Sequence, residues 1–154
     1  MSDRTTSQVT ASAQRQAYFD ELVTTATAKL RGDEVLLANL AGEHTDFIRL
    51  NNNDVRQAGS VEQQKLSVDL IEGQRHVGGT INVTGDRSMD DARIAALLGT
   101  LRDQRRLVPD DPYLLFNTEP TTTDNVKTGD IPAPDAALAD IRTAGHDKDL
   151  VGIY

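Results

Sequence analysis

Two alternating stretches separated by a short glycine turn constrain the fold of this chain more than any other feature. Leu66, Val68 and Leu70 are spaced by two residues, and the same spacing of apolar or small residues returns from Val77 to Val83. A period of two is typical of a β-strand with one buried face. Because Glu72-Gly73-Gln74 lies between the two stretches, we predict a β-hairpin here.

Shorter extended pieces precede this hairpin. Phe47, Ile48 and Leu50 form an apolar run, and the turn-prone triplet at 51–53 separates it from a second piece that starts at Val55. Residues 35–40 fit either a strand or a short helix. The predicted strand at 61–69 begins with the polar residues Glu62, Gln63, Gln64 and Lys65, which we interpret as the protection of an exposed sheet edge or face.

Two amphipathic helices flank the strands. Residues 13–31 place apolar side chains at helical spacing and are followed by Gly32, a typical helix stop. Residues 89–106 do the same, with Ser88 as the predicted N-cap. The apolar stripe of this second helix is formed by Ile94, Leu97, Leu98 and Leu101. We therefore predict an α+β fold, an antiparallel meander with these two helices packed on one face.

Composition divides the chain into four ranges. Residues 1–12 are rich in Ser and Thr and predict a flexible N-terminus, whereas 13–106 hold the α+β domain. All prolines follow residue 108, so 107–134 predicts an extended, Pro-rich connector. Residues 135–154 predict a helix and a strand. Because the chain ends in the apolar strand-like DLVGIY, we hypothesise that a longer protein continues into a further C-terminal domain.

Charge and cysteine content argue against several classes of function for this chain. The net charge is −8, and residues 107–154, with 3 basic and 9 acidic side chains, account for −6 of it. An acidic chain without a basic stripe argues against direct nucleic-acid binding, which depends on Lys and Arg contacts to phosphates. The chain has no cysteine, no apolar signal segment and no stretch long enough to span a membrane. We expect a cytoplasmic protein without membrane contact.

Three segments stand in a characteristic order along the chain. They are FIRLNNNDVRQAGS at 47–60, LSVDLIEGQRHVGGT at 66–80, and DLVGIY at 149–154. In this order they resemble the N-terminal domain of the TldD/PmbA family, and the resemblance extends over most of the chain from about Tyr18 onward. This family contains bacterial zinc metallopeptidases and their partner subunits, once described as modulators of DNA gyrase. The resemblance implies that this domain helps to enclose a chamber between two subunits, while the C-terminal part performs hydrolysis.

The residues themselves supply no catalytic constellation. The zinc-binding signature of the family is HExxxH, in which two histidines hold the metal and the glutamate activates water. Here the histidines are followed by Thr45, Val77 and Asp147, so the motif is absent. The resemblance implies that zinc is held only in the C-terminal domain of catalytic members, beyond Tyr154. We predict no catalytic residue, metal ligand or cofactor in this chain, and we interpret Gly78-Gly79 as room for a helix or neighbouring backbone.

A polar cluster around the predicted turn between the two short extended pieces is the candidate interaction surface. It consists of Arg49, Asn51, Asn52, Asn53, Arg56 and Gln57. A solvated turn, in which asparagines tolerate left-handed backbone conformations, explains the same residues equally well.

Three functional hypotheses follow. The leading one is a non-catalytic N-terminal domain of a TldD/PmbA-type metallopeptidase or its partner subunit, which contributes to assembly and encloses unfolded peptide substrate. Its partners are its own C-terminal domain and a second family subunit, in a homo- or heterodimer. The second is a free-standing protein-interaction module that acts as a protease adaptor or inhibitor. The third is an enzyme, which a deep pocket lined by Asp69, Arg75 and His76 would support.

Overall fold

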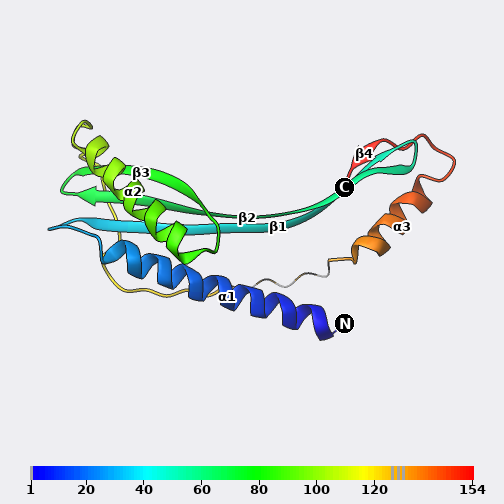
Figure 1. Ribbon diagram of the computed structural model, residues 1–154, viewed down its shortest axis with the longest axis horizontal. Coiled ribbons are helices and arrows are strands. Elements are labelled where there is room, and N and C mark those ends of the chain that lie inside the picture. Colours follow the sequence, from blue (N-terminus) through cyan, green and yellow to red (C-terminus); the bar gives the residue numbers. More distant parts are fainter. Residues whose placement is uncertain (1, 126, 128, 130) are drawn as a thin grey trace. The chain divides into compact units, whose positions relative to one another are not determined.

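The described part of the chain forms three helices and a four-stranded antiparallel sheet (Figure 1). The computed structural model describes residues 2–125, 127, 129 and 131–154, with the backbone alone for residues 2–12. The elements are α1 (Ser2–Thr27), β1 (Val35–Asn51), β2 (Asp54–Glu72), β3 (Arg75–Val83), α2 (Arg87–Arg105), α3 (Pro134–Ala144) and β4 (Gly152–Ile153). The predicted α+β class is confirmed. No helix among the described residues is long and apolar enough to cross a membrane.

The sheet has the strand order β3-β2-β1-β4. The predicted hairpin is confirmed as β2–β3, which pair from Gln64↔Val83 to Glu72↔Arg75 around Gly73, whose φ is +58°. Residues 35–40 are part of β1, so the helix alternative for them is wrong. Because β2 has a neighbour on each side, the edge alternative for its polar residues is wrong. Glu62, Gln63 and Lys65 are exposed, as the alternative of an exposed sheet face predicts.

Contacts divide the chain into two units, each built from two separate segments. Unit 1 contains residues 1–42 and 64–124, and unit 2 contains residues 43–63 and 125–154. The unit boundaries fall inside β1 and β2 and before α3, and they do not follow the composition change near residue 107.

The hydrophobic core of unit 1 lies between one face of the sheet and both long helices. The buried members are Leu22 and Ala26 from α1, Leu66, Val68 and Leu70 from β2, and Ile94, Leu98 and Leu101 from α2. Each fully buried Leu or Ile side chain contributes about 1.5–3 kcal/mol relative to exposure. Because the three elements contribute to one cluster, the prediction that the two helices cover the same face is confirmed.

The helix ends differ from those predicted. Helix α1 begins at Ser2, so residues 2–12, predicted as a flexible end, continue the helix backbone. Once a helix has nucleated, each further residue adds one hydrogen bond at little cost for Ser, Thr or Gln. The N-cap of α2 is Asp86, whose Oδ1 accepts a hydrogen bond from the Met89 amide at 3.0 Å, and Ser88 already lies inside the helix.

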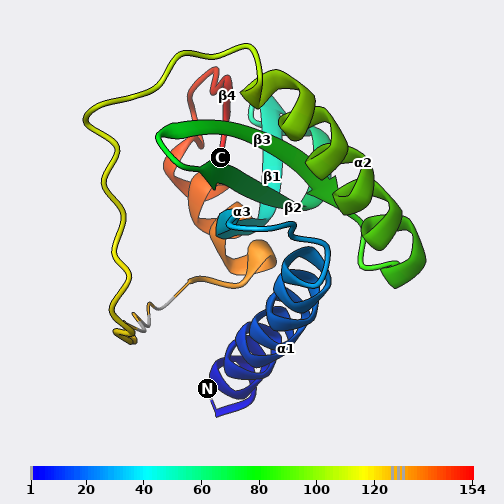
Figure 2. The same cartoon turned by 90° about the vertical axis from the view of Figure 1, so that its left-hand side faces the viewer.

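Gly79 lets α2 approach β3 closely, as predicted for the Gly78-Gly79 pair (Figure 2). A Cβ atom at this position would lie 2.7 Å from Leu97 Cδ1 and 3.2 Å from Leu101 Cδ2. We expect Gly79→Val to destabilise the protein by about 1–3 kcal/mol, because overpacking displaces the helix. Urea denaturation measures this loss, with Gly99→Val as the control for a glycine that has open space. Equal losses in both variants would contradict the packing role.

A fully buried carboxylate, Asp90, joins α1, α2 and the turn after β3. It accepts hydrogen bonds from the Tyr18 hydroxyl at 2.8 Å, from the Thr84 amide and hydroxyl at 3.0 Å, and from the Gly85 amide at 3.0 Å. Burial raises the pKa of Asp90, but these hydrogen bonds outweigh it and hold the pKa below its usual value. Burial and the bond to Asp90 raise the pKa of Tyr18 to about 12. Asp90 is therefore a charged, satisfied anchor within unit 1.

The segment after α2 is irregular but is attached to the β2–β3 turn. The Asp111 amide donates to the Gln74 carbonyl at 2.7 Å, and Arg75 Nε lies 2.6 Å from Asp110 Oδ1. In unit 2, α3 runs from Pro134 to Ala144 with Gly145 as its C-cap, so it begins with the last residue of the predicted connector.

Candidate functional site

The turn between β1 and β2 forms the centre of the predicted interaction cluster. Asn52 and Asn53 both have left-handed backbones, with φ values of 51° and 58°. Asparagine tolerates this conformation better than most residues, which is why it suits a two-residue hairpin turn. The left-handed backbone of the turn therefore accounts for the two asparagines, whether or not the cluster also binds a partner.

Asn53 is held by other residues of unit 2. Its amide donates to the Leu150 carbonyl at 3.1 Å, and its Nδ2 donates to the Arg142 carbonyl near the end of α3 at 3.3 Å. Gly145 makes room for it, since a Cβ there would lie 2.6 Å from Asn53 Oδ1. Asn53 thus connects the turn to the end of α3 and is only partly available to a partner.

The last residues of the chain pair with β1 next to this turn. Ile48 and Tyr154 exchange backbone hydrogen bonds of 2.9 and 3.0 Å, and Arg49 and Leu50 are in register with Ile153 and Gly152. Segments 47–60 and 149–154 are therefore neighbours in unit 2. Ile48 and Leu50 are buried there, whereas Val151, Ile153 and Tyr154 are exposed.

Arg49 and Arg56 are the charged members of the cluster, and both are exposed. A two-residue turn sets the register so that Arg49 lies opposite Arg56. Neither has an ion pair within the described residues, although the neighbouring Asp54 has one with Arg142 at 3.3 Å. Like charges directly opposite one another destabilise a strand pair. Asn51, Asn52 and Gln57 are also exposed, so the region around the turn can accept an acidic or polar partner.

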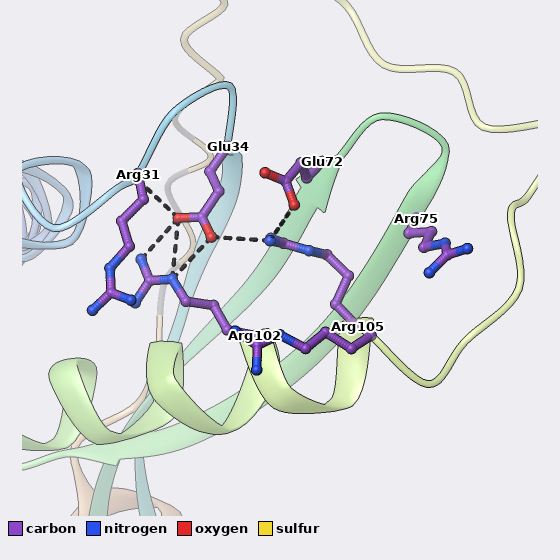
Figure 3. Close-up of a pocket in the computed structure, with 7 residues that line it drawn as sticks. Arg31, Glu34, Glu72, Arg75, Arg102 and Arg105 are labelled. Carbon is purple, nitrogen blue, oxygen red and sulfur yellow. Dashed lines mark hydrogen bonds and ion pairs between the residues drawn. The ribbon is translucent and has the colours of Figure 1, made fainter.

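A second candidate site, which the sequence analysis missed, is a pocket of about 280 Å³ in unit 1 (Figure 3). We call it the arginine pocket, and its lining residues are Arg31, Glu34, Glu72, Arg75, Arg102, Arg105 and Arg106. Arg102 and Arg105 in the last turns of α2 and the C-cap residue Arg106 have i, i+3, i+4 spacing, which puts them on one helix face. That spacing was the available signal, although the favourable interaction of cations with a helix C-terminus also accounts for these arginines.

Glu34 lies at the centre of the pocket and is buried. Arg102 binds it with two nitrogens, at 2.9 Å from Nε to Oε1 and 2.8 Å from Nη2 to Oε2, and Arg105 Nη2 lies 3.1 Å from Oε1. Arg102 Nη2 also donates to the Lys29 carbonyl at 2.7 Å. The hydrogen bond from Arg102 is the main cause that lowers the pKa of Glu34 to about 2, against the opposing effect of burial. The same bond raises the pKa of Arg102.

Arg105 connects this pair to the β2–β3 hairpin. Its Nη2 donates to Glu72 Oε2 at 2.6 Å as well as to Glu34, and Figure 3 shows the side chain between the two carboxylates. Its Nη1 is buried and has no hydrogen-bond partner among the described residues. The guanidinium of Arg31 likewise has no partner there, since only its backbone amide bonds to Glu34. The pocket therefore presents one buried unpaired donor, on Arg105, and an exposed guanidinium, on Arg31, that is free to bind an anion.

The residues named for an enzyme do not share one pocket. Arg75 lines the arginine pocket, Asp69 lines another pocket of about 360 Å³, and His76 lines neither. His76 lies between two carboxylates, 3.5 Å from Asp69 Oδ1 and 3.4 Å from Asp111 Oδ2. Within the described residues, no group of three or more His, Asp or Glu side chains is placed to hold a metal ion.

Comparison with known proteins gives no family for this chain. No protein-family model matches the sequence, and a search of curated proteins finds no match either. The fold and the two sites described above therefore provide the basis for the function.

Proposed function

We propose that this chain is the non-catalytic N-terminal domain of a TldD/PmbA-type metallopeptidase or of its partner subunit, acting in the cytoplasm. In this role it contributes to subunit assembly and helps to enclose unfolded peptide substrate. One observation supports the proposal above others. The first and last segments that carry the resemblance, 47–60 and 149–154, lie far apart in sequence yet pair as adjacent antiparallel strands. A chance likeness gives no reason for the two segments to meet.

The surface proposed for assembly combines the hairpin turn with β4. Strand β4 is at the edge of the described sheet, and its residue Ile153, which is in register with Arg49, is 69% exposed. An edge strand binds a further strand through main-chain hydrogen bonds, and apolar side chains add area to such contacts. Arg49 and Arg56 favour acidic groups on the second subunit, because opposite charges relieve their mutual repulsion.

We expect the double variant Arg49→Glu/Arg56→Glu to weaken binding to a catalytic TldD-type subunit from the same genome by at least tenfold. A tenfold loss equals about 1.4 kcal/mol, which is modest for two reversed charges at one interface. Isothermal titration calorimetry with the wild-type and variant chains measures this change. The matched control is Lys29→Glu/Lys65→Glu, which makes the same charge change at exposed positions of unit 1.

Three outcomes would contradict the proposal. The wild-type chain could bind neither the catalytic subunit nor itself, the control could lose as much affinity as the variant, or residues 1–154 alone could hydrolyse unfolded casein in a zinc-dependent manner. Inhibition of the active peptidase by the added chain would instead favour the adaptor or inhibitor hypothesis. Zinc content and hydrolysis are therefore measured on the chain alone and on the assembled complex.

A further inference from the structure

We propose that the arginine pocket binds a small phosphorylated molecule, with the phosphoryl group as a dianion held by guanidinium groups. The first support is the charge of the lining: five arginines face two glutamates. Glu34 is engaged by Arg102 and Arg105, and Glu72 is engaged by Arg105. The charges of Arg31, Arg75 and Arg106 are thus left without a carboxylate inside the pocket. This excess is local, because the chain as a whole has a net charge of −8.

The carboxylates outside the pocket do not cancel this excess. Arg75 has an ion pair with Asp110 and Arg106 has one with Asp103, but in the second pair the two atoms are 3.6 Å apart and both side chains are mostly exposed. Exposed pairs of this kind are weak and readily exchange for a better anion. Arg31 has no such pair within the described part of the chain.

The second support is an unsatisfied donor in the lining. Only 9% of the Arg105 side chain is exposed, and its Nη1 is buried without a hydrogen-bond acceptor. Buried polar groups are nearly always paired, so an orphan on a charged group points to a partner that binds from outside the chain. Phosphate oxygens are suitable acceptors, because guanidinium groups bind them through two parallel hydrogen bonds.

Volume and charge select the ligand class. About 280 Å³ lies just under the usual range of roughly 300–1,000 Å³ for ligand pockets, so a compact molecule fits better than a nucleotide. Near neutral pH a phosphoryl group carries a charge of about −1.5 to −2, more than a single carboxylate, and offers three acceptor oxygens. The local excess of positive charge therefore favours a phosphoryl group over a monocarboxylate.

The test measures the binding of inorganic phosphate to the full chain. Acetate, measured at the same ionic strength, is the carboxylate used for comparison. Calorimetry should show saturable phosphate binding and at least fivefold weaker acetate binding. Arg31→Gln and Arg75→Gln should each raise the phosphate Kd at least fivefold. Both side chains lie at the rim and contribute nothing to the Glu34 hydrogen bonds, so we expect these variants to fold. Arg142→Gln, which changes an exposed arginine of unit 2, is the matched control and should leave Kd unchanged.

A measurement on the wild-type chain keeps the test independent of variant folding. Phosphate titration should shift the NMR signals of the pocket arginine Nε–H groups and leave that of Arg142 in place. Absence of saturable phosphate binding, equal binding of acetate, or equal loss in Arg142→Gln would each overturn the proposal. Subunit binding is measured separately, so failure of the assembly proposal does not affect this result.

Discussion

Glu34→Gln should lower the free energy of unfolding by about 3–5 kcal/mol, one of the two largest effects that we expect in this chain. The substitution keeps the shape of the side chain but removes the charge that compensates two buried arginines. Arg102 would then be a buried cation whose charge partner is gone and which stays fixed to the Lys29 carbonyl, while Arg105 would keep only its pair with Glu72. Removing one partner of a buried pair is costly for this reason, even where the pair as a whole adds little stability.

Urea denaturation followed by circular dichroism measures the loss. The matched control is Glu72→Gln, which removes the other carboxylate bound by Arg105 but whose side chain is 51% exposed. We expect the control to lose no more than about 1 kcal/mol, because solvent screens that pair. Similar losses of unfolding free energy in the two variants would contradict the explanation that Glu34 stabilises the fold because it is buried.

The same carboxylate gives a pH dependence with a defined sign. Its pKa in the folded chain is about 2, below the ordinary value of 4.5, so the folded state favours the charged form. Stability from Glu34 is therefore fully present above pH 4.5 and is lost as the pH falls towards 2. Unfolding curves between these values should show a smaller pH slope for Glu34→Gln than for the wild-type chain.

The second large effect is expected for Asp90→Ala, which should lower the free energy of unfolding by about 3 kcal/mol. The variant removes the acceptor of the Tyr18 hydroxyl and of the Thr84 and Gly85 amides, and these donors then lack a partner inside unit 1. Unsatisfied buried donors cost about 1–3 kcal/mol each, although water that enters the cavity reduces the total.

Two measurements check this effect. Urea denaturation gives the stability, with Asp91→Ala as the control, because Asp91 forms only a partly exposed pair with Arg87 at 3.3 Å. Ultraviolet titration gives the pKa of Tyr18, which should fall from about 12 towards 10 once Asp90 is gone. A stable variant with an unchanged tyrosine titration would contradict the anchor role of Asp90.

Local patterns made much of the fold predictable. The hairpin of β2 and β3 follows from a period of two around Gly73, and the buried stripe of α2 follows from helical spacing. The close contact at Gly79 was predictable because a glycine pair inside a strand has few other uses. In each case the residues that determine the structure lie within a few positions of one another.

The remainder depends on contacts between distant residues. Glu34 binds Arg102 and Arg105 across 68 and 71 positions of sequence, and a single sequence carries no sign of which charges will meet. The internal position of β2 follows from its pairing with β1 and β3, which its own polar residues do not reveal. The N-cap of α2 is Asp86 rather than Ser88, and Asp90 in the first turn binds both the Thr84 amide before the cap and the distant Tyr18 hydroxyl.

The division of each unit into two segments has a consequence for the order of synthesis. Unit 1 is complete at residue 124, whereas unit 2 requires residues 125–154 as well as the hairpin turn. Because chains emerge from the ribosome N-terminus first, unit 1 has all its residues before β4 exists. During that interval β1 has no β4 partner at Arg49 and Leu50, and its unpaired edge is open to other chains. The time needed to translate residues 125–154 therefore determines how long this edge of β1 remains unpaired.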